Sequence, residues 1–350
     1  MIAIAGRARA WWLVAAPLLL TLISIPIEAA LAAMVDDFEH PGQWKASSSE
    51  GVELDIAQDK GHTGMAMRLD FDFHGRGGHT IARREVAMRL SANYQFSFQI
   101  RAEAPVNHLE FKLVDRSQNV WWLKQRDVVL PTDWQKKVIK KRHIRFAWGP
   151  ANGGEPTDIS AIELAIAAGS GGKGSIWIDD LAIEERKPQE DRPPVPVVRA
   201  STAAPGHEAE SVLDNDQATA WRSGAVAEDQ WLLFDFGEAR EYGGLVIDWD
   251  AEDHAVAYEV QVSDDGEGWQ RVYGVEEGNG GRDYVSLPDG ESRYLRLWLT
   301  QSSRDHGYGI KDIAIKPYEF SLTPNHFFAA VAADAGKGSY PRYLGGQQSY

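Results

Sequence analysis

The sequence predicts an all-β protein, with two tandem β-sandwiches and a short helical tail. Apolar and polar residues alternate with period two, turns rich in Gly, Asp and Asn are frequent, and long stripes with the helical period are few. The 350 residues are 43% hydrophobic, which is enough to bury more than one core. Prolines mark a semi-rigid linker at 188–198. We therefore expect one sandwich at 33–187 and a second at 199–320.

The first 32 residues have the pattern of a signal peptide. Arg7 and Arg9 precede an apolar run at 11–27, and Ala30, Leu31 and Ala32 supply a small-residue cleavage site. This predicts export to the periplasm or the medium. An uncleaved membrane anchor is the alternative, because the run approaches the roughly 20 residues that span a bilayer.

Composition excludes several classes of function. The net charge of -15 disfavours nucleic acid as a partner. The chain has no cysteine, so disulfides, thiolate metal sites and a cysteine nucleophile are excluded. Thirteen Trp, eleven Tyr and twelve Phe suit both pleated sheets and stacking against sugar rings.

Three segments of the first block, at 95–101, 109–113 and 120–126, each alternate between an apolar and a polar side. If the apolar sides share one core, the polar sides form one sheet face that carries an aromatic residue. That face would hold Gln99, Arg101, Glu110, Lys112, Trp122, Lys124 and Arg126. We take Arg101, Trp122, Lys124 and Arg126 as candidate ligand contacts. A plain solvated face is the alternative.

The second block repeats this pattern, and a helix follows it. Strands are predicted at 231–236, 245–249, 258–262 and 295–299, with a tight turn at 264–266. In the tail at 321–350, Thr323 is a predicted N-cap, Pro324 occupies the first helical position, and residues 329–335 are good helix formers. We expect a short helix with no domain around it.

The ends of the first block carry a family resemblance. It opens with Val-Asp-Asp-Phe-Glu at 35–39 and closes with Gly-Ser-Ile-Trp-Ile-Asp-Asp-Leu at 174–181, with Phe-Ala-Trp-Gly-Pro at 146–150 between them. This framing resembles the galactose-binding-like jelly rolls found as carbohydrate-binding modules. The resemblance implies that the first and last strands lie side by side. It also implies a structural calcium near them, held by Asp37, Glu39 and Asp180. These acids could equally be exposed edge or turn residues.

The second block matches a family more closely. The run at 212–221, the strand at 231–237, Trp249, an A-Y-x-V-x-x-S-x-D-G-x-x-W pattern at 257–269 and Tyr-Leu-Arg-Leu at 294–297 follow in order. Over about 199–317 the chain resembles the coagulation factor V/VIII type C domain, also called discoidin domain. The resemblance implies calcium beside a D-x-D-x-x-T turn, with Asp214, Asp216, Thr219 and Asp312 at the matching positions. The same turn also forms without metal, since Asp and Asn favour it.

Ligands of that family bind loops at one end of the sandwich. The candidates by chemistry are Arg222, Arg304, His306 and Tyr308, which we expect on loops that offer donors and an aromatic face. An ordinary solvated loop is the alternative. The loop at 225–229 is acidic and weakly apolar, which disfavours membrane docking.

Known catalytic motifs are missing from the sequence. It contains no H-E-x-x-H, G-x-S-x-G or P-loop pattern, and the Gly-rich stretch at 169–174 predicts a hairpin loop. The sequence therefore predicts an exported, non-catalytic carbohydrate-binding protein. A jelly-roll glycosidase or polysaccharide lyase is one alternative, and a cell-surface protein-interaction module is another. Residues 340–350 are similar to the entry into the catalytic region of bacterial discoidin-containing glycosidase-like proteins, so we expect an accessory role beside a downstream catalytic domain.

Overall fold

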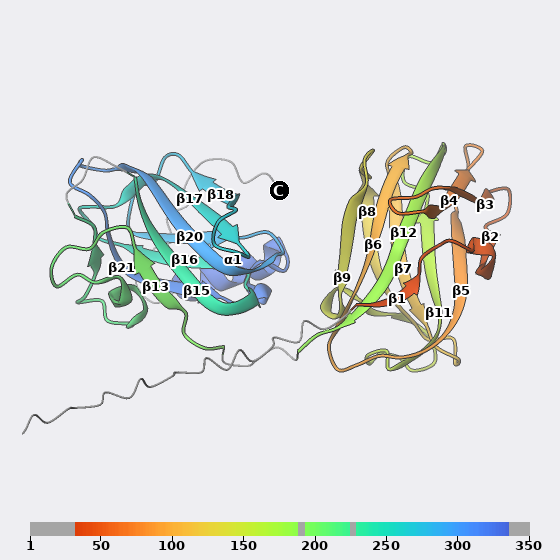
Figure 1. Cartoon of the computed structure of the whole chain (residues 1–350), viewed down its shortest axis with the longest axis horizontal. Coiled ribbons are helices and arrows are strands. Elements are labelled where there is room, and N and C mark those ends of the chain that lie inside the picture. Colours follow the sequence, from red (N-terminus) through yellow and green to blue (C-terminus); the bar gives the residue numbers. More distant parts are fainter. Residues whose placement is uncertain (1–31, 188–192, 225–228, 336–350) are drawn as a thin grey trace, which may run out of the picture. The chain divides into compact units, whose positions relative to one another are not determined.

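The structure, a computed structural model, describes residues 32–187, 193–224 and 229–335 (Figure 1). The chain divides into two compact units, residues 1–190 and residues 191–350. The predicted signal peptide lies outside the described residues apart from its last residue, as do residues 188–192 of the predicted linker. Within the described ranges, no helix has the length and apolar character needed to cross a membrane.

The first unit is a sandwich of two six-stranded antiparallel sheets. Sheet A runs in the order β3 (Glu53–Lys60), β4 (Met65–Asp72), β12 (Lys173–Glu185), β6 (Tyr94–Glu103) and β9 (Gln135–Lys140), with β1 (Ala33–Asp36) paired to β12. Sheet B runs in the order β10 (Arg145–Trp148), β8 (Val120–Val128), β7 (Asn107–Val114), β11 (Asp158–Ala167), β5 (His79–Arg89) and β2 (Trp44–Ser48). The pairing of β1 with β12 confirms that the first and last strands lie side by side.

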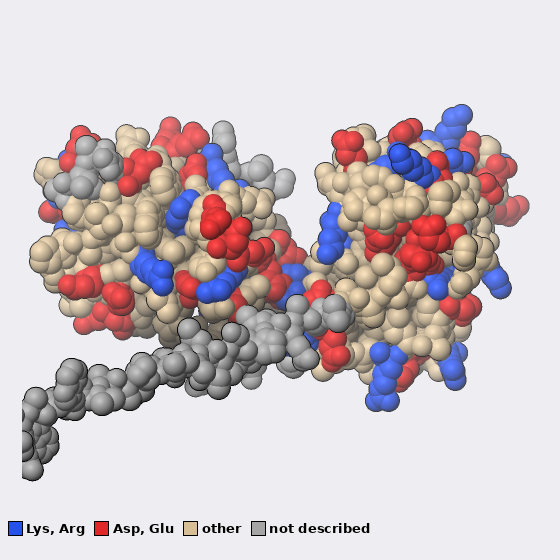
Figure 2. All heavy atoms as spheres, in the orientation of Figure 1, with Lys and Arg blue, Asp and Glu red and all other residues tan. Residues whose placement is uncertain are grey.

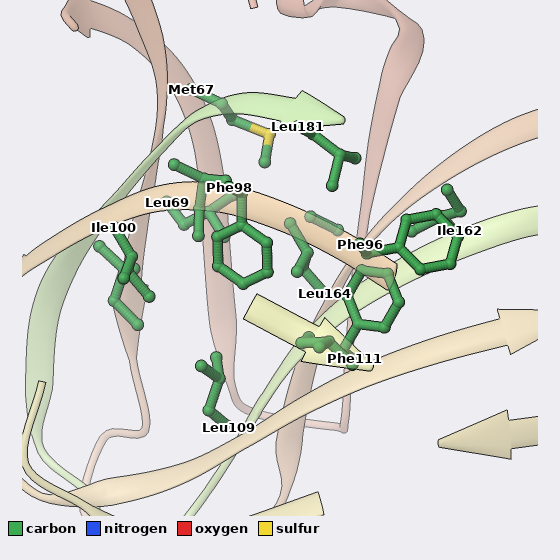
Figure 3. Packing of buried hydrophobic residues seen from close by; sticks show 14 of the residues in the cluster. Met67, Leu69, Phe96, Phe98, Ile100, Leu109, Phe111, Ile162, Leu164 and Leu181 are labelled. Carbon is green, nitrogen blue, oxygen red and sulfur yellow. The ribbon is translucent and has the colours of Figure 1, made fainter. Parts of the chain in front are cut away.

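The core of this unit lies between its two sheets (Figure 3). Phe96, Phe98 and Ile100 point inward from β6, and Phe111 meets them from β7. The Phe98 and Phe111 rings stack at 6.3 Å between centroids. Burying such side chains stabilises the fold by about 2 kcal/mol each, and period-two alternation keeps polar residues on the outer faces. The apolar sides predicted for these two strands are confirmed.

The second unit is also a β-sandwich. Sheet C runs in the order β13 (Val197–Ala200), β15 (Gln230–Glu241), β20 (Glu291–Ser302), β17 (Ala255–Ser263) and β18 (Gln270–Val275). Sheet D runs in the order β14 (Trp221–Arg222), β21 (Gly309–Lys316), β16 (Gly244–Trp249) and β19 (Arg282–Ser286). The four predicted strands correspond to β15, β16, β17 and β20. The predicted turn at 264–266 joins β17 to β18, with Gly266 at a φ of 79° that favours glycine.

The predicted helix is present as α1 (Pro324–Ala335), and the Thr323 hydroxyl accepts a hydrogen bond from the His326 amide at 3.2 Å. The expectation that no domain surrounds it is wrong. Phe327 and Val331 pack with Val246 of sheet D, and the Asp334 carboxylate pairs with Arg282 of β19 at 2.8 Å. The packing of its apolar face makes α1 part of the second unit.

Candidate functional site

The outer face of sheet B carries a surface that we call the basic tryptophan patch. Its members are Glu110, Lys112, Trp122, Lys124, Arg126, Arg145 and Trp148, contributed by β7, β8 and β10. Strand register places Trp122 beside Lys112 on one side and Arg145 on the other, and places Lys124 beside Glu110. Side chains opposite each other on one face of a sheet lie within contact distance. The register therefore gathers charge and aromatic surface at one place.

The two tryptophans of the patch form a corner. The Trp122 and Trp148 rings meet edge to face, with centroids 5.1 Å apart and planes at 88°. Trp148 is 47% exposed, whereas most tryptophans of this chain are buried or half-buried. A tryptophan with an open ring face on a rigid strand is suited to stacking against a flat apolar ligand surface such as a sugar ring.

One carboxylate organises the lysines of the patch. Glu110 pairs with Lys112 at 3.0 Å and with Lys124 at 2.8 Å, and the Glu110 and Lys112 side chains are each only 5% exposed. Burial alone would raise the pKa of Glu110, but hydrogen bonds from Lys124 and Lys112 hold the pKa below its usual value. The Lys124 ammonium also lies 5.0 Å from the Trp122 ring centroid. The lysines are thus held in place beside the aromatic corner.

Arg101 does not belong to this face, contrary to the sequence prediction. Its strand β6 is in sheet A, so Arg101 and Gln99 lie on the opposite outer face of the sandwich from Trp122. The Arg101 guanidinium lies over the Trp177 ring at 3.8 Å and near the Trp134 ring at 5.5 Å. Alternation shows which side of a strand is apolar but not which sheet the strand joins, and the chain changes sheets between β6 and β7.

Two of the three carboxylates predicted for calcium in the first unit contact one loop, which joins β3 to β4. Glu39 accepts a hydrogen bond from the Met65 amide at 2.9 Å, and Asp180 accepts one from the Thr63 hydroxyl at 2.9 Å. Asp37 instead accepts the Glu39 amide within its own turn. Throughout the described ranges, no three His, Asp or Glu side chains are grouped as a metal site would need. Calcium here stays a prediction.

The predicted D-x-D-x-x-T turn of the second unit is present. Asp214 accepts hydrogen bonds from the Thr219 hydroxyl at 2.7 Å and the Asp216 amide at 2.8 Å, and Asp216 accepts the Ala218 amide. Burial raises the pKa of Asp312, and the negative charges of Asp248 and Asp214 raise it further. These carboxylates are not grouped as a metal site would need either, so calcium at this turn also stays a prediction.

Two loop candidates of the second unit, Arg222 and Arg304, share one carboxylate partner. The Asp253 carboxylate lies 3.2 Å from Arg222 and 2.9 Å from Arg304, and Arg222 also pairs with Asp250. Arg222 lies in the short strand β14 rather than on a loop. These pairs organise the end of the sandwich.

His306 and Tyr308 have opposite outcomes. His306 is exposed on the loop between β20 and β21, as expected. The expectation of an exposed Tyr308 ring is wrong, because Tyr308 is 5% exposed and belongs to the core, where burial raises its pKa to about 12. Backbone pairing with Ser223 continues the β14 to β21 ladder through this residue and directs its ring inward.

Sequence reasoning missed a buried carboxylate in the second core. Asp283 is fully buried in β19 and accepts hydrogen bonds from the Trp249 indole at 2.7 Å and the Tyr258 hydroxyl at 2.8 Å. Burial raises the pKa of Asp283 to about 6, although both hydrogen bonds act to lower it. Trp249 and Tyr258 belong to the signature recognised in the sequence, and Asp283 is the residue that joins their polar atoms.

Residues 197–313 match the family model of the F5/8 type C domain. The match begins with β13 and ends within β21, so it covers nearly all strands of the second unit. The resemblance predicted for about 199–317 is confirmed.

One curated relative is similar to part of the chain. The polysaccharide lyase 8 family protein HylA of Enterococcus faecalis is 31% identical over 121 residues, which cover 33% of this chain and 9% of the relative. The chain therefore spans only a small part of that protein.

Solved carbohydrate-binding modules are also similar to parts of the chain. Chitosan-binding module 2 of a chitosanase/glucanase from Paenibacillus sp. IK-5, in complex with chitotriose, is 25% identical with a TM-score of 0.33, covering 35% of this chain and 95% of the module. The family 11 carbohydrate-binding module from Clostridium thermocellum, in complex with a mixed-linked tetrasaccharide, is 19% identical with a TM-score of 0.39, covering 44% of this chain and 95% of the module.

Trp148 and Arg145 of the first unit were also missed as site residues. Trp148 lies in the segment at 146–150 that carried the jelly-roll resemblance, but nothing in its alternation indicated that β10 would pair with β8. A register shift between Phe146 and Trp148 also interrupts the period of two. Only the pairing of strands reveals the patch.

Proposed function

We propose that the chain is a non-catalytic carbohydrate-binding protein whose principal glycan-binding surface is the basic tryptophan patch of the first unit. The observation that carries the proposal is the half-exposed Trp148 ring, placed edge to face against Trp122 and beside two lysines that Glu110 holds in position. A stacking platform and fixed donors are the two elements that a shallow sugar site requires.

Similarity to carbohydrate-binding modules supports this proposal. The F5/8 type C domain is proposed as a second, weaker contact at its loop end, where Arg222 and Arg304 are already paired with acids. Two linked modules that engage one polymer gain affinity through effective concentration. We also propose that the N-terminal segment directs export of the protein. The two units would then act as accessory modules of a catalytic domain encoded downstream.

Affinity electrophoresis of the full chain against a panel of soluble polysaccharides tests the proposal. We expect retardation by at least one polysaccharide, and about a tenfold loss of affinity in Trp148→Ala, because an aromatic contact contributes about 1 kcal/mol or more. Trp134→Ala, on the opposite outer face, is the matched control and keeps wild-type retardation.

Two results would contradict the proposal. One is equal retardation of Trp148→Ala and the wild type by every glycan that binds. The other is release of new reducing or unsaturated chain ends by the purified chain alone, which would show that it is an enzyme.

A further inference from the structure

The charge of the basic tryptophan patch differs from that of the whole chain. The chain carries a net charge of -15, and Figure 2 shows acidic side chains spread over the visible face of both units. The patch instead contains four cationic side chains, those of Lys112, Lys124, Arg126 and Arg145, and a single carboxylate, that of Glu110. Such a local excess on an acidic protein creates a positive potential confined to one place.

The pairing within the patch leaves this charge unneutralised. Glu110 is shared between Lys112 and Lys124, so one negative charge faces two positive charges. Arg126 and Arg145 are exposed, and neither forms an ion pair with any residue of the described ranges. The Lys124 side chain is 27% exposed, so its ammonium is held by Glu110 while part of it stays accessible. Charge-assisted hydrogen bonds from such preorganised donors are stronger than those from neutral donors.

A groove at one edge of sheet A in the same sandwich is acidic. This groove, of about 870 Å³, is lined by five carboxylates and one lysine. They are Glu53, Asp55, Asp70, Asp72, Glu103 and Lys173. An anionic polymer is repelled from this groove and attracted to the patch, so the first unit presents one patch that accepts anions and one groove that rejects them.

We propose, resting on the proposed function, that the patch selects acidic polysaccharides, with a sugar ring stacked on Trp148 and the acidic groups of the chain bound by Lys124, Arg126 and Arg145. The acidic group is a carboxylate or a sulfate ester, because both are planar or compact oxyanions that accept hydrogen bonds from lysine and arginine. Neutral glycans of the same backbone offer these donors no charged partner and hence bind more weakly.

Matched polymers test this proposal on the full chain. Polygalacturonate is compared with its carboxyl-reduced neutral counterpart, and dextran sulfate with dextran, by affinity electrophoresis and titration at two salt concentrations. We expect at least one acidic polymer to bind about tenfold or more tightly than its neutral partner, and salt to weaken that binding. The two pairs distinguish carboxylate from sulfate.

Variants identify the side chains responsible. Lys124→Gln, Arg126→Gln and Arg145→Gln each lower affinity for the acidic polymer, by about tenfold for Lys124→Gln, and each lowers it by more than it lowers affinity for the neutral partner. Lys136→Gln, an exposed lysine on β9 of sheet A, is the matched control and binds like the wild type. Thermal melting verifies that each variant is folded.

The outcomes separate this proposal from the one on which it rests. Equal binding of acidic and neutral partners, with loss of both in Trp148→Ala, overturns acid selectivity and keeps the carbohydrate site. Equal losses in Lys136→Gln and Lys124→Gln also overturn it, because they indicate diffuse attraction. Retardation by no polysaccharide of the wider panel overturns both proposals.

Discussion

The two sandwiches bury charge in different places. In the first unit, Glu110 and Lys112 are almost completely buried, yet they lie on an outer sheet face, paired with each other and beside an exposed tryptophan. In the second unit, Asp283 is buried inside the core, and its partners are the neutral donors Trp249 and Tyr258. A charge paired at a surface can be offered to a ligand, whereas a charge within a core can only contribute to the fold.

Tryptophans on the outer sheet faces differ in whether another side chain covers their rings. In both units an arginine covers a pair of tryptophans: Arg101 lies against Trp177 and Trp134, and Arg296 lies 3.8 Å from the Trp269 ring and 4.5 Å from the Trp298 ring. Covered rings of this kind belong to the fold. The Lys112 ammonium lies 5.6 Å from the Trp148 ring centroid, but 47% of the surface of Trp148 is exposed. Exposure of the ring, rather than the presence of a tryptophan, is what distinguishes a binding surface.

The largest effect is expected from breaking the buried pair at the surface. Glu110→Ala leaves Lys112 buried without its carboxylate, which lowers the free energy of unfolding of the first unit by about 4 kcal/mol. Glu110→Leu combined with Lys112→Met removes both charges and recovers most of that loss. Urea denaturation, monitored by hydrogen exchange of peptides from each unit, measures the loss in Glu110→Ala and its recovery in the double variant. A loss below about 1 kcal/mol in Glu110→Ala would show that water reaches the lysine and that the pair is not buried.

Removing the charge of Asp283 from the second core is expected to stabilise the second unit, whereas Glu110→Ala destabilises the first. Burial raises the pKa of Asp283 from 3.8 to about 6, so the folded state binds the proton more tightly than the unfolded state. The stability linked to this proton is fully present below about pH 4 and is lost as pH rises through about 6, a loss of about 3 kcal/mol. Asp283→Asn therefore raises the stability of the second unit at pH 7 by about that amount.

Melting curves of the second unit between pH 4 and 7 measure this effect. As the pH rises from 4 to 7, the wild type loses stability relative to Asp283→Asn. Near pH 4 the two proteins are equally stable. If the stabilities of the wild type and Asp283→Asn changed equally across this pH range, Asp283 would not be a buried carboxylate with a raised pKa. Glycan binding of Asp283→Asn equals that of the wild type, because the residue does not reach the surface.

Calcium is expected to stabilise the second unit through the turn at Asp214. The family resemblance implies that Asp214, Asp216, Thr219 and Asp312 hold the ion, and their side chains would have to draw together around it, because no three carboxylates of the described ranges are grouped as a metal site would need. A ligand at a hundred times its dissociation constant stabilises the folded state by about 2.7 kcal/mol. Added calcium raises the melting temperature of the EDTA-treated wild type and leaves that of Asp312→Ala unchanged. An identical response of the two proteins would place the ion elsewhere.

The smallest effect is expected from the arginines that cover tryptophans. Arg296→Ala removes contacts with two rings and two hydrogen bonds to Gln261, which lowers the stability of the second unit by about 1 to 2 kcal/mol. Arg101→Ala has a similar effect on the first unit. Both variants bind polysaccharide like the wild type in affinity electrophoresis. Loss of binding in Arg101→Ala would show that the outer face of sheet A contacts the ligand. Ring exposure would then not distinguish a binding surface from a structural one.

The sequence by itself determined the all-β class, the apolar sides of β6 and β7, the turn at Asp214 and the family of the second unit. Those features depend on local alternation and on short motifs whose spacing the chain carries directly. It placed Trp122, Lys124 and Arg126 on one side of one strand for the same reason.

Only the tertiary structure decided which strands share a sheet. It separated Arg101 from Trp122, brought Trp148 and Arg145 to the patch from a strand whose period is interrupted, turned Tyr308 into the core and packed α1 onto sheet D. Pairing between strands depends on hydrogen bonds and packing between residues far apart in the sequence, and a single strand carries no record of its neighbour. A binding surface built across three strands is therefore visible only after the chain has folded.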